Sequence, residues 1–115
     1  MRLSFERGTV VTVSLDPAVG SEIRKTRPAV VVSNSVACAH DSVVQVVPLT
    51  GLPERELRPY ESQVTSAESG VGKPSRAVMN QVRTVSKQRL CRVIGRISAL
   101  EEAELDRALR IQLAL

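Results

Sequence analysis

Aromatic residues are nearly absent from this chain of 115 residues, which has one Phe, one Tyr and no Trp. Stacking platforms for single-stranded nucleic acid and grooves for proline-rich peptides are both lined by aromatic rings. The composition therefore argues against both kinds of site. The 43% hydrophobic fraction must form a core mainly from Val, Leu, Ile and Ala, and a bound partner must be held mainly by charge and hydrogen bonds.

Cysteine and histidine are also scarce. The two cysteines, Cys38 and Cys91, do not have the spacing of metal ligands, and each stands beside apolar or small residues. We therefore expect reduced, buried thiols without a disulfide. His40 is the only histidine, so catalysis by a histidine pair within one subunit is excluded, and beside Asp41 it is typical of a solvated side chain. Phosphate-binding glycine motifs and zinc motifs are missing, and we expect no metal and no cofactor.

Long hydrophobic runs are missing as well. No stretch approaches the length that spans a membrane. Residues 2–7 lack the apolar core of a secretory signal. We therefore expect a cytoplasmic protein with no membrane partner, and the chain length favours a single domain over residues 1–115.

Basic residues are in excess. Lys and Arg number 16 against 12 acidic residues, a net charge of +4, and 13 of the 16 are Arg. Arginine binds phosphate and carboxylate groups through two parallel hydrogen bonds. The excess fits an RNA or DNA partner, an acidic protein, or simply a soluble surface, and charge alone does not separate these.

Apolar runs bounded by Gly, Pro, Asp and Ser predict a chain of short strands. They cover residues 8–15, 28–33, 42–50, 61–65, 75–85 and 90–97. In the first, Val11, Val13 and Leu15 face one way, which indicates a half-buried strand. Pro48 has no amide donor, so its strand should end at an edge or a bulge. A short helical turn over 34–40 would be capped by Asn34 or Ser35.

The last segment has the clearest helix pattern. Ser98 and Glu101 have the spacing of a capping box. An apolar stripe then follows at Leu105, Ala108, Leu109, Gln112 and Leu113. Several short strands followed by one helix indicate an α+β fold, which we expect to be a small, strongly bent barrel.

The segment around Arg27 is the strongest candidate for a site. A polar loop runs from Asp16 into an apolar strand, and Pro28 holds Arg27 extended at the joint. Its guanidinium either faces a phosphate or lies on the surface with its stem covering the core; the residues alone leave both open. Thr50 ends the strongest strand. Its hydroxyl either forms a hydrogen bond with the backbone or donates one to a phosphate oxygen. Glu22 is an ordinary loop acid, or a group that orients Arg27 or accepts a proton.

Taken in order, several segments resemble the MazF/PemK toxins of bacterial toxin–antitoxin systems. The resemblance rests on Arg7-Gly8, Leu15-Asp16-Pro17-x-x-Gly20-Ser21-Glu22, Arg27-Pro28-Ala29-Val30-Val31-Val32-Ser33-Asn34, Val47-Pro48-Leu49-Thr50, Asn80-Gln81-Val82-Arg83-Thr84-Val85-x-Lys87-Gln88-Arg89-Leu90 and the end of the last helix, residues 110–115. The loop that runs into Arg27-Pro28 and the Gln-x-Arg-Thr segment are the specific parts.

The resemblance implies an SH3-like barrel of the CcdB/Kid/MazF type that forms a homodimer. It also implies a sequence-specific, metal-independent endoribonuclease that cleaves single-stranded mRNA by 2′-hydroxyl attack, giving 2′,3′-cyclic phosphate and 5′-hydroxyl ends. A cognate antitoxin would cover the RNA groove with an acidic C-terminal tail. By this resemblance the catalytic residues are Arg27, Thr50 and Glu22, and the RNA-binding residues are Ser21, Arg24, Lys25, Ser33, Asn34, Asn80 and Gln81.

The chain departs from the family pattern at a few positions. Thr9 and Val11 replace an acidic and an aromatic residue. One branch of the family has a catalytic Arg and Asp where this chain has Val78 and Asn80, and a His where it has Ser21. The resemblance therefore favours chemistry by Arg27 and Thr50. Two alternatives stay open: a CcdB-like toxin that poisons gyrase, and a non-enzymatic SH3-like interaction module. The presence of Arg27 and Thr50 weighs against the first, and the lack of aromatics weighs against the second.

Overall fold

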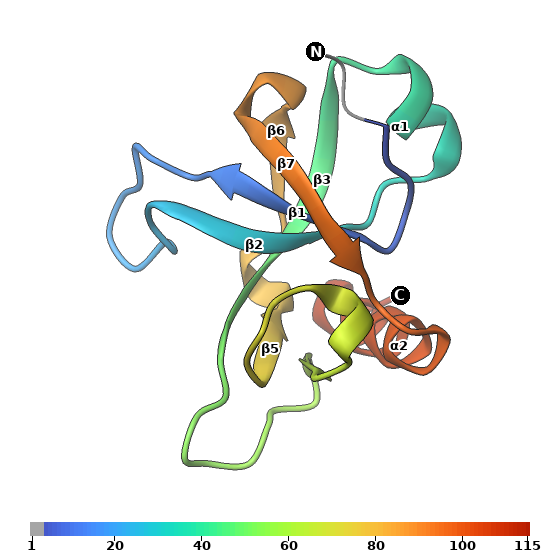
Figure 1. The fold of residues 1–115 in the computed structure, drawn as a ribbon. Coiled ribbons are helices and arrows are strands. Elements are labelled where there is room, and N and C mark those ends of the chain that lie inside the picture. Colours follow the sequence, from blue (N-terminus) through green and yellow to red (C-terminus); the bar gives the residue numbers. More distant parts are fainter. Residues whose placement is uncertain (1–3) are drawn as a thin grey trace.

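The computed structural model of the chain describes residues 4–115. The first three residues of the expected domain, including Arg2 and Leu3 of the opening segment, lie outside the described part. The elements are β1 (Thr9–Ser14), β2 (Thr26–Val31), α1 (Ser35–His40), β3 (Val43–Gly51), β4 (Glu61–Val64), β5 (Ser75–Val78), β6 (Arg83–Ser86), β7 (Leu90–Arg96) and α2 (Ala99–Leu113), with 3₁₀ turns η1 (Ala67–Ser69), η2 (Met79–Gln81) and η3 (Lys87–Arg89) (Figure 1).

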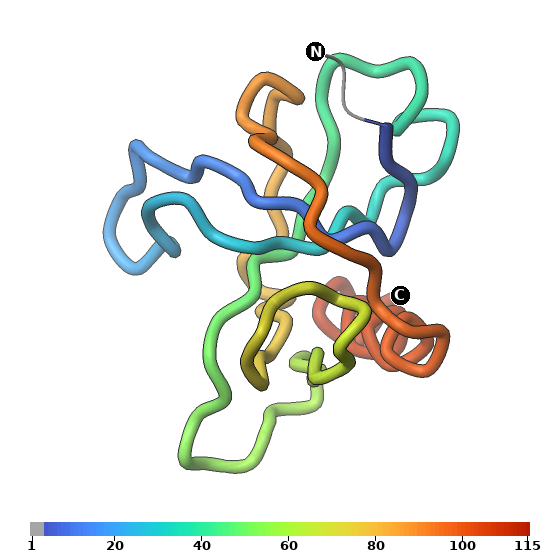
Figure 2. Tube along the Cα trace, viewed as in Figure 1, coloured from blue at the N-terminus to red at the C-terminus, as the bar shows by residue number. Residues whose placement is uncertain are grey.

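The strands form one bent antiparallel sheet in the order β4-β5-β3-β2-β1-β7, and β6 pairs with β3 beside this path. The α+β class is confirmed. The sheet is open, however, with β4 and β7 at its two ends, where we expected a barrel. Figures 1 and 2 show β1 and β2 running together to the left of the view and α2 lying at the lower right. No helix in the described part of the chain combines the length and the apolar character that crossing a membrane requires.

β3 changes partners along its length, and Pro48 lies at the change. Residues 43–46 pair with β6 and residues 49–51 pair with β5, while Pro48 is opposite Ala29 of β2 on the other side. A residue without an amide donor fits this gap in the ladder. The 3₁₀ turn η2 bridges the gap between the two partner strands. The predicted strand over 75–85 is therefore two strands and a turn.

Because side chains alternate between the two faces of β1, this strand contributes residues to two separate hydrophobic cores. Val11, Val13 and Leu15 share one core with Val44 and Cys38, as their predicted common face requires. Val10, however, is fully buried in the other core, beneath Leu105 and Ala108 of α2. β1 is thus buried on both faces at this position, because the bent sheet and α2 cover both sides, and the expectation of a half-buried strand was wrong there.

Both helices begin as the sequence predicts. The Asn34 side chain accepts a hydrogen bond from Ala37 N at 2.9 Å and caps α1. Ser98 and Glu101 form the full capping box of α2. The apolar stripe of α2 is buried at its start, but Leu113 in the last turn is 50% exposed.

The two cysteines are free, as expected, but they differ in burial. Cys38 is buried in the α1 side of the core, and this burial raises the pKa of its thiol. Cys91 is exposed, contrary to expectation. It lies in β7, at one end of the open sheet, where no further strand covers it.

Candidate functional site

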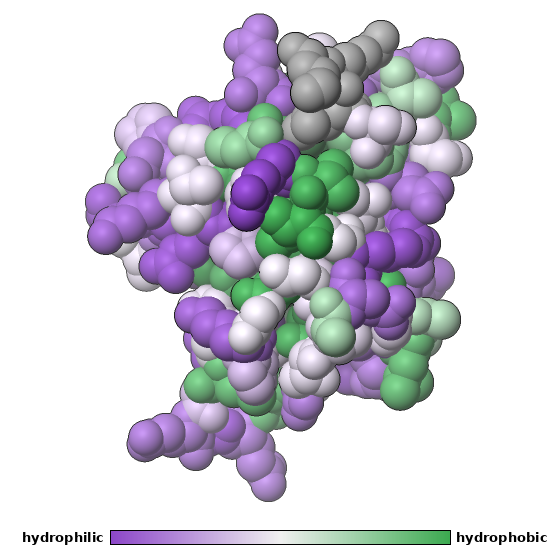
Figure 3. Space-filling view, viewed as in Figure 1, coloured by the Kyte–Doolittle hydropathy of each residue, from purple (hydrophilic) through white to green (hydrophobic). Residues whose placement is uncertain are grey.

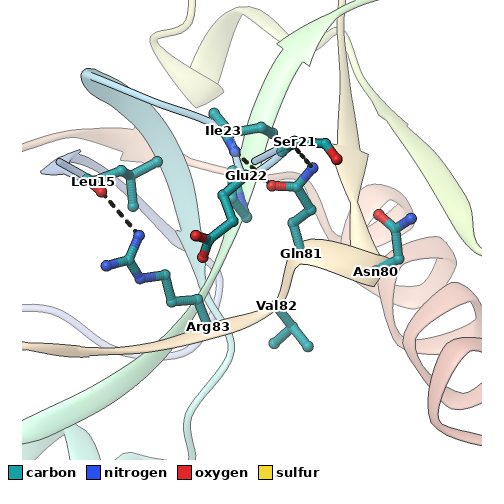
Figure 4. Close-up of a pocket in the computed structure, with 9 residues that line it drawn as sticks. Leu15, Ser21, Glu22, Ile23, Asn80, Gln81, Val82 and Arg83 are labelled. Carbon is teal, nitrogen blue, oxygen red and sulfur yellow. Dashed lines mark hydrogen bonds between the residues drawn. The ribbon is translucent and has the colours of Figure 1, made fainter. Parts of the chain in front are cut away.

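A cleft of about 480 Å³ lies between the β1–β2 loop (residues 15–25) and the segment that joins β5 to β6. Its lining residues are Leu15, Ser21, Glu22, Ile23, Pro48, Asn80, Gln81, Val82 and Arg83. The fold creates this cleft because η2 crosses beside Pro48, where β3 has no strand partner on that side. Two segments that are about 60 residues apart in the sequence therefore face each other (Figure 4).

Gln81 fastens the β1–β2 loop across the cleft with both ends of its amide. Its Oε1 accepts a hydrogen bond from Ile23 N at 2.7 Å, and its Nε2 donates to Ser21 O at 3.2 Å. Arg83 adds a third bond, from Nη1 to Leu15 O at 3.0 Å. All three bonds go to the backbone of the loop, so these anchors leave its side chains free for other contacts.

Glu22 points into the space between Arg83 and Gln81 (Figure 4). Its Oε1 accepts a hydrogen bond from Val19 N at 2.6 Å, within the same loop. The residue is exposed, and the other carboxylate oxygen remains available on the cleft side. A carboxylate held in this way can orient a cation or accept a proton.

The loop ends in a turn that fixes the position of Arg27. Lys25 has a left-handed backbone with φ of 69°, and its amide donates to Asp16 Oδ1 at 3.1 Å. Arg27 Nε then donates to Arg24 O at 3.2 Å. The base of the loop is closed from outside by Arg89, which donates to Ser14 O and Asp16 O.

The β2–β3 ladder ends before it reaches Arg27 and Thr50. Its last pair is Ala29–Pro48. Beyond that pair, β3 continues beside β5, and the Arg27 end of β2 is paired with β1. Because side chains alternate along a strand, Thr50 shares a sheet face with Pro48, which lines the cleft. Neither Arg27 nor Thr50 is among the lining residues, and their joint action stays a prediction.

The predicted RNA-binding residues do not all come together. Ser21, Asn80 and Gln81 line the cleft, and Arg24 and Lys25 are exposed on the loop beside it. Figure 3 shows hydrophilic side chains gathered over this loop, at the left of the view.

Ser33 and Asn34 lie at the other end of β2, away from the cleft. Ser33 is buried; its hydroxyl donates to Gln45 Oε1 at 2.7 Å and accepts from Gln45 N at 2.8 Å. Asn34 caps α1. Both side chains already have local partners, and their role in binding RNA stays a prediction.

Other groups that could carry chemistry are dispersed. His40 is exposed at the last position of α1, as expected of a solvated side chain. Among residues 4–115, no three His, Cys, Asp or Glu side chains gather as a metal site would require.

The family model of the PemK-like, MazF-like toxins of type II toxin–antitoxin systems matches residues 6–113. This match spans both halves of the cleft. The chain belongs to this toxin family.

Curated relatives resemble this toxin over nearly its whole length. Endoribonuclease MazF9 of Mycobacterium tuberculosis is 40% identical over 116 residues, which cover 96% of this chain and 98% of the relative. Endoribonuclease EndoA of Bacillus subtilis is 30% identical over 110 residues, which cover 96% of this chain and 95% of the relative.

Solved structures support the same fold. MazF of Deinococcus radiodurans superposes with a TM-score of 0.84 at 20% identity, covering 99% of this chain and all of the other. A mycobacterial endoribonuclease in complex with its cognate antitoxin superposes with a TM-score of 0.77 at 22% identity, covering 96% and 95% of the two chains. At these identities the superposition shows the fold.

Five of the nine lining residues were not among the predicted site residues: Leu15, Ile23, Pro48, Val82 and Arg83. Arg83 is the charged one, and it holds the loop through Leu15 O. The available signal was its place in the Gln-x-Arg-Thr segment that carries the resemblance. A charged residue at the start of a strand is more often solvated. The position of Arg83 beside the cleft follows from the pairing of β6 with β3, which the sequence does not reveal.

Proposed function

We propose that this toxin is an endoribonuclease that cleaves single-stranded mRNA at specific sequences in the cytoplasm, works as a homodimer, and is neutralised by a cognate antitoxin with an acidic tail. Two curated relatives carry the name endoribonuclease. A solved neighbour is described as an endoribonuclease with its cognate antitoxin. The observation that carries the proposal is the polar cleft itself, where Gln81 fastens the β1–β2 loop and the Glu22 carboxylate faces the opening.

The proposed reaction needs no nucleophile from the protein. The ribose 2′-oxygen attacks the adjacent phosphorus, the bond from phosphorus to the 5′-oxygen breaks, and a 2′,3′-cyclic phosphate and a 5′-hydroxyl result. Extra negative charge develops on the non-bridging oxygens during attack. Arg27 would stabilise this charge, and the Thr50 hydroxyl would donate a hydrogen bond to one of the same oxygens.

The 2′-hydroxyl must lose a proton, and the departing 5′-oxygen must gain one. A guanidinium stays protonated in proteins and is a poor base, so Arg27 is assigned to charge stabilisation. Glu22 is the proposed base, because its carboxylate faces the cleft and the loop that carries it is fastened by Gln81. No metal takes part in this scheme, which makes activity in EDTA one of its tests.

Sequence preference would come from the polar groups around the cleft. Base edges of splayed single-stranded RNA are read by hydrogen bonds, and Ser21, Asn80 and Gln81 offer such groups. Arg24 and Lys25 would contact phosphates. Ser33 and Asn34 would take part only where the RNA continues past the other end of β2.

The test is cleavage of a long RNA by the pure protein in EDTA, mapped by primer extension. Wild type should cut at defined sites. Arg27→Ala should lower the rate by about 100- to 1,000-fold, the usual loss when one preorganised donor to a charged transition state is removed. Arg92→Ala serves as the matched control, because Arg92 is an exposed arginine on β7, and it should cleave like wild type.

Three results would contradict the proposal. The first is a wild-type protein that leaves diverse RNAs intact. The second is an Arg27→Ala variant, folded by circular dichroism, that cleaves at the normal rate. The third is growth arrest with intact RNA and blocked gyrase, which would favour the CcdB-like alternative.

A further inference from the structure

A row of polar residues crosses the sheet beside Thr50. The β3–β5 ladder pairs Thr50 with Arg76, and the β4–β5 ladder pairs Arg76 with Gln63. The row is therefore Thr50, Arg76 and Gln63, on the three adjacent strands β3, β5 and β4. Residues directly opposite one another in antiparallel strands share a sheet face, so all three side chains leave the sheet on the same side.

The other side of the same strands is covered by α2. Leu49, Ala77 and Val64 alternate with the row residues and are buried in one core with Leu105 of the helix. Thr50 and Arg76 are thus on the face opposite α2, whereas Gln63, on the end strand β4, lines a cavity together with Glu101 and Glu104 of the helix. Gln63 is exposed, and the Arg76 side chain keeps 21% of its surface accessible.

Arg76 is held in a fixed position by groups at the edge of the row. Its Nε lies 3.0 Å from Glu61 Oε2, and its Nη1 donates to Gly51 O at 3.2 Å. Within residues 4–115 the contact of Nε is an ion pair without hydrogen-bond geometry, Nη1 makes the hydrogen bond, and Nη2 makes none. A guanidinium whose position is fixed before a ligand arrives loses little conformational entropy on binding.

The local charge around Arg76 remains positive. Glu61 is 4% exposed and is also bound by Arg55, with Nη1 to Oε1 at 2.8 Å and Nη2 to Oε2 at 3.1 Å. One buried carboxylate is therefore shared by two guanidinium groups, which leaves the group of three with a net charge of +1. An anion that approaches Arg76 meets an attractive field.

We propose that Arg76 is a second phosphate-binding residue of this site, which holds a phosphate of the RNA beside the one contacted by Arg27 and Thr50. Arg76 stands one strand spacing, about 5 Å, from Thr50, so its guanidinium would contact a neighbouring phosphate of the same RNA strand. Gln63 extends the track by one more strand. The inference rests on the proposed ribonuclease function and adds the direction in which the RNA leaves the cleft, toward β5 and β4.

The test measures binding without cleavage. An RNA that carries the mapped cleavage site, with 2′-deoxyribose at the attacking position, is titrated with wild type and with Arg76→Gln at several salt concentrations. Loss of one phosphate contact should weaken binding about tenfold at low salt and reduce the slope of log K against log salt by about 0.7. The weakening should be similar for RNAs of different sequence around the site.

A second arm locates the phosphate. Single phosphates of the same RNA are replaced one at a time by neutral methylphosphonates. One replacement near the cleavage site should weaken binding by wild type but cause no further weakening with Arg76→Gln. This coupling between one phosphate and one side chain would not arise if Arg76 only stabilised Glu61.

Two controls separate binding from structure. Arg55→Gln disturbs Glu61 from a position in the β3–β4 loop rather than in the row, and it should lower stability without changing the salt slope. Arg92→Gln removes an exposed positive charge on β7, and it should leave the slope near that of wild type. Both variants have the same loss of charge as Arg76→Gln.

The proposal is overturned if Arg76→Gln keeps the wild-type slope, if Arg55→Gln changes the slope equally, or if no methylphosphonate is coupled to Arg76. These outcomes are distinct from failure of the proposed function, which would appear as no cleavage of the matching all-ribose RNA by wild type.

Discussion

The two long loops of this toxin share one kind of anchor and differ in a second. Outside side chains bond to the backbone of the β1–β2 loop, from Gln81, Arg83 and Arg89. The backbone of the β3–β4 loop (residues 52–60) is bonded in the same way, by Glu61 and Arg107. The β3–β4 loop in addition sends its own Arg55 to Glu61. The β1–β2 loop projects to the left of the view and the β3–β4 loop lies at the bottom (Figure 1).

The difference indicates which loop is built to meet a ligand. In the β1–β2 loop the Lys25 ammonium has no partner among residues 4–115, while Arg24 Nη2 donates to Gly20 O at 3.4 Å. In the β3–β4 loop the Arg55 charge is paired with Glu61, although its side chain is 39% exposed. The pairing of the charges in a loop is thus a better guide to its role than its charge content, which is high in both.

Breaking the anchor of the β3–β4 loop should have the largest effect on stability. Glu61→Gln leaves two guanidinium groups without their carboxylate, and we expect a loss of about 2 kcal/mol at pH 7, less than for a fully buried pair because both arginines keep some contact with water. The hydrogen bonds from Arg55 hold the pKa of Glu61 below its ordinary value of 4.5, although burial opposes them. Urea unfolding measures the loss.

The pH dependence provides the check on this prediction. A lowered carboxylate pKa contributes stability above the unfolded value and loses it as pH falls through the folded value. The difference between wild type and Glu61→Gln should therefore be constant above about pH 5 and shrink below about pH 4.5. Glu104→Gln on exposed α2 surface is the matched control. A difference that persists unchanged at pH 3 would contradict the ion-pair explanation.

Most of the fold follows from local sequence patterns, and the failures have a common cause. Strand alternation, the Asn34 cap and the Ser98–Glu101 box are properties of neighbouring residues, and the structure confirms them. The split of 75–85 and the burial of Val10 depend on partners distant in the sequence. Cys91 falls at an irregularity of the β1–β7 ladder, between Leu90 and Arg92, which no pattern near Cys91 could reveal.

The site was predicted by resemblance, and its geometry was not. The sequence placed Arg27 at a loop–strand joint, and the structure shows that the β2–β3 ladder ends two residues before it, at Ala29–Pro48. Gln81 was expected to bind RNA, and the structure also gives it a bond at each end of its amide to the β1–β2 loop. Such bonds join residues about 60 apart and cannot be read from spacing.

Breaking the Gln81 anchor should have an intermediate effect. Gln81→Leu leaves Ile23 N and Ser21 O without their partner, which should cost about 1 kcal/mol of stability. Hydrogen exchange at the Ile23 amide should become faster, and cleavage should fall about tenfold because Glu22 is no longer held over the cleft. Gln88→Leu, an exposed glutamine in η3, is the control and should change none of these. If Gln81→Leu slows cleavage while Ile23 exchange stays at the wild-type rate, Gln81 acts on the RNA and not on the loop.

Removing a charge from the anchored loop should have the smallest effect on stability and a clear effect on binding. Lys25 holds the loop through its backbone, and no hydrogen bond or ion pair engages its ammonium group within residues 4–115. Lys25→Gln should therefore change the free energy of unfolding by less than about 0.5 kcal/mol. It should also reduce the salt slope for the uncleavable RNA by about 0.7.

Lys73→Gln, at an exposed lysine in the η1–β5 connection, is the matched control and should change neither quantity. If Lys25→Gln instead destabilises the fold by more than 1 kcal/mol and leaves the salt slope unchanged, the Lys25 ammonium group stabilises the fold and does not bind RNA. The contrast between the two loops would then fail at this residue.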